Sequence, residues 1–165
     1  MLNGTYEPHF DRNLIGTERA PITIKKTIGA LDIAFKNLPP ITEDLTVYRS
    51  IAKPPSFFKD TCRLFDKSIK IKPGETMVMR AYPYCSPDIE YARAFRGDEG
   101  SILYEIILPK GTKVSQGRAG YMGHYGDYVL PRHSQFRCIS NEVLERDGTH
   151  LIKLEYILPN EPWRK

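Results

Sequence analysis

The sequence predicts a single-domain α+β protein with mainly antiparallel sheets. Helical periodicity is concentrated near the start of the chain, and short β-branched and aromatic runs with hairpin-length connections fill the rest. The 165 residues suit one domain, and roughly two-thirds of their surface can be buried on folding. With 41% apolar and 27% charged residues, the composition is that of a globular rather than a disordered chain.

Two helices are expected. Residues 1–19 have no periodicity and are assigned to an irregular N-terminal arm, followed by a single domain over 20–165. In 21–40 an apolar stripe expected to face the core recurs at helical spacing, formed by Ile24, Ile28, Leu31 and Phe35. Pro39-Pro40 ends this helix. Ser86 is expected to cap a second helix that stops near Gly97.

The expected strands are short and separated by turn residues. They cover 45–51, part of 73–86, 101–109, 127–132, 134–140 and 151–159. The stretch 61–71 is ambiguous and reads as a loop or a short helix.

Several protein classes are excluded by the sequence. No apolar run approaches the ~18 residues of a membrane span, and the polar N-terminus has no signal-peptide core, so a cytoplasmic protein with no membrane partner is expected. Neither a Rossmann glycine fingerprint nor a P-loop occurs, and the four histidines are not spaced for a metal. The three cysteines are expected to be reduced thiols, with a nucleophilic Cys85 as a minor alternative.

Three segments occur in an order typical of one enzyme family. Val47-Tyr48-Arg49-Ser50 ends a predicted strand, Tyr84-Cys85-Ser86 precedes a predicted helix, and Tyr125-Gly126-Asp127 enters a strand ending in Leu-Pro-Arg. This order resembles the mono-ADP-ribosyltransferases of bacterial toxins and phages, which carry an Arg, a Ser-Thr-Ser and a Glu-x-Glu motif. The resemblance extends over roughly residues 20–158.

The resemblance implies a fold and an activity. It implies two packed, mainly antiparallel sheets with a few helices around an NAD cleft. The implied reaction transfers one ADP-ribose from NAD, as co-substrate and without a metal, to a macromolecule, and nicotinamide is released. The acceptor is expected to be a protein rather than a nucleic acid.

The resemblance also assigns roles to residues. Cleavage of the nicotinamide–ribose bond leaves an oxocarbenium-like centre, which a fixed carboxylate stabilises. Asp127 would be that carboxylate, Ser86 would orient it, and Arg49 would hold the ribose-phosphate. Further candidates are Ser50, Tyr84 and Arg96 for the cofactor, and Tyr121 and Tyr125 for the acceptor.

The chain departs from the family pattern at three points. Asp127 replaces a Glu and is one methylene shorter, a loss of reach that can cost ~10²-fold in rate. Tyr125 stands where the family carries Glu or Gln, and Tyr84-Cys85-Ser86 keeps only the last member of Ser-Thr-Ser. A catalytically silent relative that binds NAD or a partner is therefore an alternative.

A basic stretch supports a second alternative. The chain carries a net charge of +4, and 110–137 interleaves tyrosines with basic residues, namely Lys110, Lys113, Arg118, Arg132 and Arg137. Such a surface suits an acidic protein or nucleic acid. A basic binding module that does not bind NAD is thus a further alternative. The basic residues could equally be ordinary solvent-exposed charges without a partner.

Overall fold

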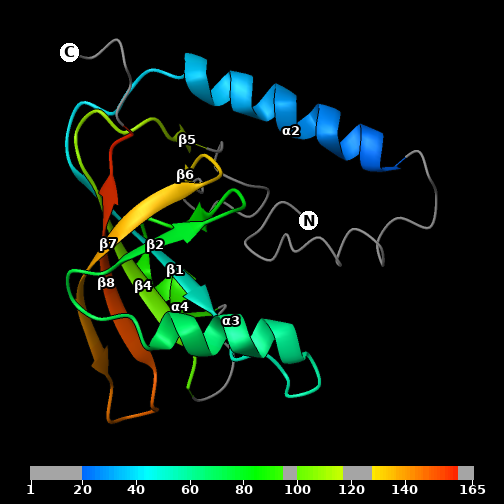
Figure 1. Cartoon of the computed structure of the whole chain (residues 1–165). Coiled ribbons are helices and arrows are strands. Elements are labelled where there is room, and N and C mark those ends of the chain that lie inside the picture. The colour runs from blue at the N-terminus through cyan, green and yellow to red at the C-terminus, as the bar shows by residue number, and fades with distance from the viewer. Residues whose placement is uncertain (1–19, 95–99, 117–127, 160–165) are drawn as a thin grey trace.

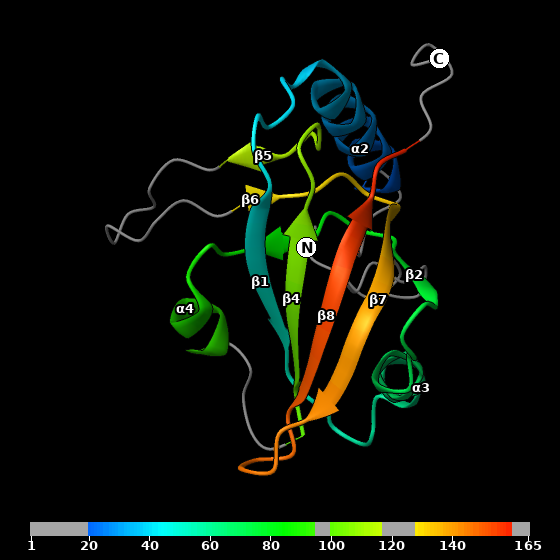
Figure 2. The same cartoon turned by 90° about the vertical axis from the view of Figure 1, so that its left-hand side faces the viewer.

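The computed structural model describes residues 20–94, 100–116 and 128–159, and the side chains from residue 25 onward in the first range. Two sheets and three helices make up this part of the chain. Figures 1 and 2 show the larger sheet upright with α2 above it, and Figure 2 shows α3 and α4 beside opposite edges of the sheet. The α+β class predicted from the sequence is confirmed.

The larger sheet has five strands in the order β1-β4-β8-β7-β2. Its strands are β1 Leu45–Ile51, β2 Thr76–Met79, β4 Ile102–Leu108, β7 Ser134–Val143 and β8 His150–Ile157. All pairs are antiparallel except β4 with β8, which run parallel. Of these neighbours, only β7 and β8 are consecutive strands in the chain, so the expectation of hairpin connections is wrong for most of this sheet.

The smaller sheet has three strands in the order β3-β6-β5. They are β3 Tyr84–Cys85, β5 Ser115–Gln116 and β6 Tyr128–Val129, all antiparallel. A β-bridge between Tyr48 and Ser86 joins this sheet to β1, the edge strand of the larger sheet. The two sheets therefore meet where β1 and β3 run side by side.

The core lies on the inner face of the larger sheet. Alternate residues of its strands are fully buried there, including Val47, Ile106, Leu154 and Phe136. Phe65 of α3 and Leu130, which follows β6, complete the cluster. Helix α3, Lys59–Ile69, resolves the ambiguous stretch 61–71 in favour of a helix.

Helix α2, Ala20–Asn37, has the position predicted for the first helix but is less buried than expected. Phe35 is buried, whereas Ile28 and Leu31 are only half-buried, and Ile33 is exposed. Figure 1 shows why: α2 lies beyond one end of the larger sheet instead of across its face. The side chain of Ile24 lies outside the described residues.

Helix α4, Ile89–Ala94, begins later than predicted. Asp88, not Ser86, caps it, because the Asp88 carboxylate accepts the N–H groups of Glu90 at 2.9 Å and Tyr91 at 3.4 Å. Ser86 instead accepts the Asp88 N–H at 3.1 Å, a turn that leads into the helix. The predicted end near Gly97, with Phe95, lies outside the described residues.

Candidate active site

The structure brings together two of the three segments singled out in the sequence. The backbone N–H of Tyr48 donates to the carbonyl of Ser86 at 2.7 Å, and the N–H of Ser86 donates to the carbonyl of Tyr48 at 2.8 Å. These reciprocal bonds make Ser86 the neighbour of the strand end that carries Arg49, although 37 residues separate Ser86 from Arg49 in the sequence.

Arg49 lies on the inner face of β1, directly opposite Tyr104 of β4. Its guanidinium Nη1 donates to the carbonyl of Tyr84 at 2.9 Å, which links the β1 end to β3. Burial lowers the pKa of Arg49 against the opposing influence of Cys85 and Tyr104, but a guanidinium remains charged at physiological pH. Burial also raises the pKa of Tyr104 to about 12, so its phenol stays neutral beside Arg49.

No carboxylate in 20–94, 100–116 or 128–159 forms an ion pair with Arg49. A half-buried cation without a counter-charge has lost part of its hydration, and an anion that docks on it recovers that loss. The planar fork of an arginine suits phosphate or carboxylate oxygens in particular. The Arg49 guanidinium can therefore pair with a phosphate or a carboxylate.

Ser86 is buried, with 5% of its surface exposed, and its backbone is fixed by both bonds to Tyr48. Its hydroxyl oxygen accepts the Asp88 N–H, and no hydrogen bond within the described part of the chain uses the hydroxyl proton. A serine hydroxyl carries one proton to donate. The Ser86 hydroxyl can therefore donate to a carboxylate that approaches it.

Two further sequence candidates lie in this region. The Ser50 hydroxyl donates to the carbonyl of Ala92, which ties β1 to α4 and commits the proton of this hydroxyl to a structural bond. Tyr84 on β3 is 38% exposed. Cys85, between Tyr84 and Ser86, is buried, so a thiol nucleophile open to solvent is not found there.

The third segment lies largely outside the described residues. Asp127, Arg96, Tyr121 and Tyr125 all belong to this undescribed part of the chain. The strand that follows Asp127 is described: Tyr128 of β6 lies directly opposite Cys85 of β3, and Val129 lies opposite Tyr84. The chain thus enters β6 beside the residue that precedes Ser86.

Comparison with solved structures identifies the fold. C3larvin toxin, an ADP-ribosyltransferase from Paenibacillus larvae, superposes with a TM-score of 0.60 at 20% identity, over 92% of this chain and 84% of that one. The Clostridium limosum C3 exoenzyme gives 0.61 at 16% identity, over 84% of this chain and 70% of that one. C3stau2 from S. aureus, solved with NAD, gives 0.60 at 18% identity, over 83% of this chain and 72% of that one.

The protein has the ADP-ribosyltransferase fold. No family model and no curated protein matches the sequence. At these identities the match establishes architecture, and the residues that would carry activity must be judged from their own geometry. The fold expected from the three short segments is confirmed.

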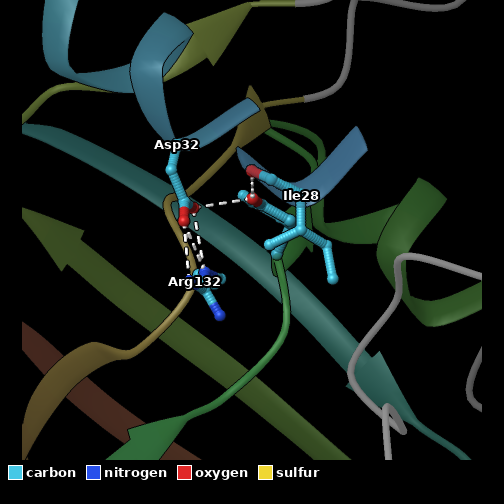
Figure 3. A network of polar contacts seen from close by, with 4 residues as sticks. Ile28, Asp32 and Arg132 are labelled. Atoms are coloured by element: carbon cyan, nitrogen blue, oxygen red, sulfur yellow. Dashed lines mark hydrogen bonds and ion pairs between the residues drawn. The ribbon is translucent and has the colours of Figure 1, made fainter. Parts of the chain in front are cut away.

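In this ADP-ribosyltransferase fold, a network that the sequence did not reveal fastens α2 to the smaller sheet (Figure 3). Arg132, three residues after β6, donates from Nε to both Asp32 carboxylate oxygens at 2.9 and 2.8 Å and from Nη2 at 2.7 Å. The Tyr82 hydroxyl lies 2.8 Å from the same carboxylate and 3.1 Å from the carbonyl of Ile28. Tyr82 also stacks on Phe35, with ring centroids 5.6 Å apart.

This network accounts for part of the basic stretch 110–137. Arg132 is neutralised by Asp32, and the ammonium of Lys113 donates to the carbonyl of Lys36 at 2.6 Å. Two of the five basic residues thus serve the fold, and Arg118 lies outside the described residues. Lys110 and Arg137 are exposed.

Two other features bear on the kind of site. Within the described ranges, no three side chains of the types that ligate metals come together. None of the described helices is both long and apolar enough to span a membrane.

Proposed function

We propose that this protein transfers ADP-ribose from NAD to a macromolecular acceptor and releases nicotinamide. The observation that carries the proposal is the junction of β1, β3 and β6, because it unites the surroundings of all three sequence segments. Arg49 lies near the end of β1, Ser86 is bridged to Tyr48, and β6 begins opposite Cys85. The fold supports the proposal, because C3stau2, which has the same architecture, was solved with NAD.

Each group would have a defined task in this reaction. Arg49, a cation without a counter-ion in the described part of the chain, would bind the phosphates of NAD and hold the ribose in place. Asp127 directly precedes Tyr128 in the sequence, and Tyr128 lies opposite Cys85. The carboxylate of Asp127 would stabilise the oxocarbenium-like centre that forms as nicotinamide departs.

Ser86 would act through Asp127 rather than on the substrate. Its hydroxyl proton is uncommitted among the described residues, and its backbone is held on both sides by Tyr48. A donated hydrogen bond of this kind fixes the orientation of a carboxylate and favours its charged form. Tyr84 offers an exposed aromatic face on the same strand, suited to stacking on the nicotinamide or the acceptor. Arg96, Tyr121 and Tyr125 remain candidates from the sequence alone.

The experiment that tests the proposal is incubation of the full chain with NAD labelled on its adenylate portion and a bacterial lysate. Free nicotinamide and macromolecule-bound label are followed together, and the label is then challenged with protease and with nuclease. We expect both signals, with the label lost on protease treatment. Label lost only to nuclease would assign a nucleic-acid acceptor.

A second candidate function is NAD binding without turnover. The shorter Asp127 and the degraded Ser-Thr-Ser motif favour it, because a carboxylate about one methylene too far away loses most of its effect on the rate. Saturable NAD binding without nicotinamide release would support this candidate. A folded protein that binds no NAD would contradict both.

A further inference from the structure

Two aromatic side chains stand exposed at the loop between β1 and α3. Phe57 is 73% exposed and Phe58 52%, and their ring centroids lie 4.4 Å apart. We call this pair the aromatic tip. Figures 1 and 2 show that the segment between β1 and α3 lies at the edge of the molecule in both views. Paired exposed rings of this kind are unusual on a protein surface that has no partner.

The aromatic tip is held in a defined turn. The Phe58 N–H donates to the carbonyl of Pro55 at 3.0 Å, and the Cys62 N–H donates to the carbonyl of Phe58 at 2.9 Å. The Cys62 thiol lies 3.4 Å from the same Pro55 carbonyl. Prolines 54 and 55 restrict the backbone before the turn. The backbone that carries the rings is therefore held in place, and little backbone ordering is needed when the rings are buried.

The surroundings of the aromatic tip are basic. Residues 53–70 contain five basic and two acidic residues, a net charge of +3. All five basic side chains belong to exposed residues, namely Lys53, Lys59, Arg63, Lys67 and Lys70. One of the two acidic residues, Asp60, lies only at the limit of ion-pair distance, 4.0 Å from Arg63. This flank is complementary to an anionic surface.

We propose that the aromatic tip and its basic flank form a docking surface for an anionic lipid bilayer. Rings inserted at the headgroup level combined with several cationic side chains are the requirements for binding to a membrane surface. Four of the five basic residues are lysines, which protein interfaces disfavour, whereas attraction to anionic headgroups depends on charge alone. Binding of this kind needs no membrane-spanning segment. The proposal therefore revises only the expectation that the protein has no membrane partner.

The docking surface is close in the chain to the candidate active site. Its loop begins directly after Ile51, two residues beyond Arg49. A bilayer bound there would hold that end of β1 near the membrane and near acceptors attached to it. The proposal does not depend on turnover of NAD, so its test and the test of the proposed function fail independently.

The test is co-sedimentation of the full chain with phosphatidylcholine vesicles, with and without phosphatidylserine. We expect binding only to vesicles that contain phosphatidylserine, and weaker binding at high salt. Replacing both rings, Phe57→Ala with Phe58→Ala, should weaken binding at least about tenfold, because the apolar contribution is lost. Lys53→Glu with Lys59→Glu should abolish it.

A matched control removes exposed apolar side chains elsewhere. Ile139 and Val143 of β7 are 43% and 58% exposed, and Ile139→Ala with Val143→Ala should leave vesicle binding unchanged. A Phe57→Trp variant adds a direct readout, a blue-shifted emission on phosphatidylserine vesicles. Absence of vesicle binding, or binding that the double alanine variant retains in full, would overturn the proposal. Capture of an acidic protein through the aromatic tip, without vesicle binding, would also overturn it.

Discussion

The surroundings of Arg49 indicate why an arginine occupies this position. It is half-buried, donates to the carbonyl of Tyr84, and has no carboxylate partner in the described part of the chain. Burying a cation costs free energy unless an anion compensates it. A substrate anion that binds Arg49 would offset the cost of burying this cation on an otherwise apolar strand face.

The variant Arg49→Lys tests this role. Lysine keeps the charge but loses the two-pronged geometry, so we expect nicotinamide release from NAD to fall by about 10²-fold or more. Arg137→Lys, on an exposed position of β7, is the matched control and should leave the rate unchanged. Equal rates for wild type and Arg49→Lys, with both proteins folded by circular dichroism, would remove Arg49 from the site.

Asp127 is the residue whose length decides between an enzyme and a silent relative. If it occupies the catalytic position, Asp127→Glu restores about 1.5 Å of reach and should raise the rate of nicotinamide release by about tenfold or more. Asp127→Asn keeps the shape and removes the charge, and should reduce release to background. Unchanged turnover in Asp127→Ala would show that the carboxylate lies elsewhere.

At the scale of elements, α2 is attached by a polar network as well as by the stacking of Phe35 on Tyr82. Asp32 receives Arg132 and Tyr82, and these side chains come from three segments that lie far apart in the sequence. Both members of the ion pair are partly exposed, with side-chain exposures of 37% for Arg132 and 28% for Asp32, so solvent screens part of their attraction.

The variant Asp32→Asn should lower the free energy of unfolding by about 1–2 kcal/mol, measured by urea denaturation at neutral pH. Burial alone would raise the pKa of Asp32, but the hydrogen bonds from Arg132 and Tyr82 and the nearby positive charges outweigh it and lower the pKa. This contribution is therefore complete above the unfolded pKa of about 3.9 and is lost as the pH falls through the folded value.

In Asp32→Asn the difference from wild type should accordingly shrink below about pH 4. Asp66→Asn is the control, because Asp66 is exposed on α3, and its effect on stability should be small at every pH. A difference between wild type and Asp32→Asn that persists unchanged at pH 3 would mean that the carboxylate charge does not hold α2.

The elements also show where sequence reasoning fails. The sequence predicts Ser86 as the cap of α4, because a serine before a proline is typical of an N-cap. In the structure the Asp88 carboxylate accepts the first N–H groups of the helix instead. The Ser86 backbone is instead committed to β1 by the bridge to Tyr48. The contact between Ser86 and Tyr48 thus outweighs the local capping preference of Ser86, and the cap lies two residues later, at Asp88. The stretch that forms α3 is ambiguous in the sequence, and Phe65 is the one buried residue of this helix.

At the scale of the whole molecule, ligand binding and folding are coupled. A ligand that binds only the folded protein stabilises it, by about 2.7 kcal/mol at one hundred times Kd. If NAD binds at the junction of β1, β3 and β6, saturating NAD should raise the thermal midpoint of the wild type by several degrees. Arg49→Gln should lose most of this shift.

The same measurement applies to a catalytically silent protein, because it needs no turnover. Adenosine, which lacks the phosphates, is the control ligand and should produce little shift at the same concentration. A shift that is equal in wild type and Arg49→Gln would place NAD, if it binds, away from Arg49.

The sequence alone determined the type of most elements and the residues most worth examining. Periodicity located α2 and the strands, because side-chain burial repeats locally along a helix or strand. The Arg49 strand end, the Ser86 segment and the Asp127 segment pointed to the ADP-ribosyltransferase fold through their order in the chain. These signals survive in a single sequence since each depends on a few adjacent residues.

Only the tertiary structure decided how the elements combine. The parallel pairing of β4 with β8, the bridge from β1 to β3 and the ion pair of Asp32 with Arg132 join positions that are 38 to 100 residues apart. Such contacts form because they bury one shared hydrophobic core and give polar groups their hydrogen-bond partners. Residues adjacent in the sequence do not determine them. That is why the sequence named Arg49 and Ser86 separately, while the fold made them neighbours.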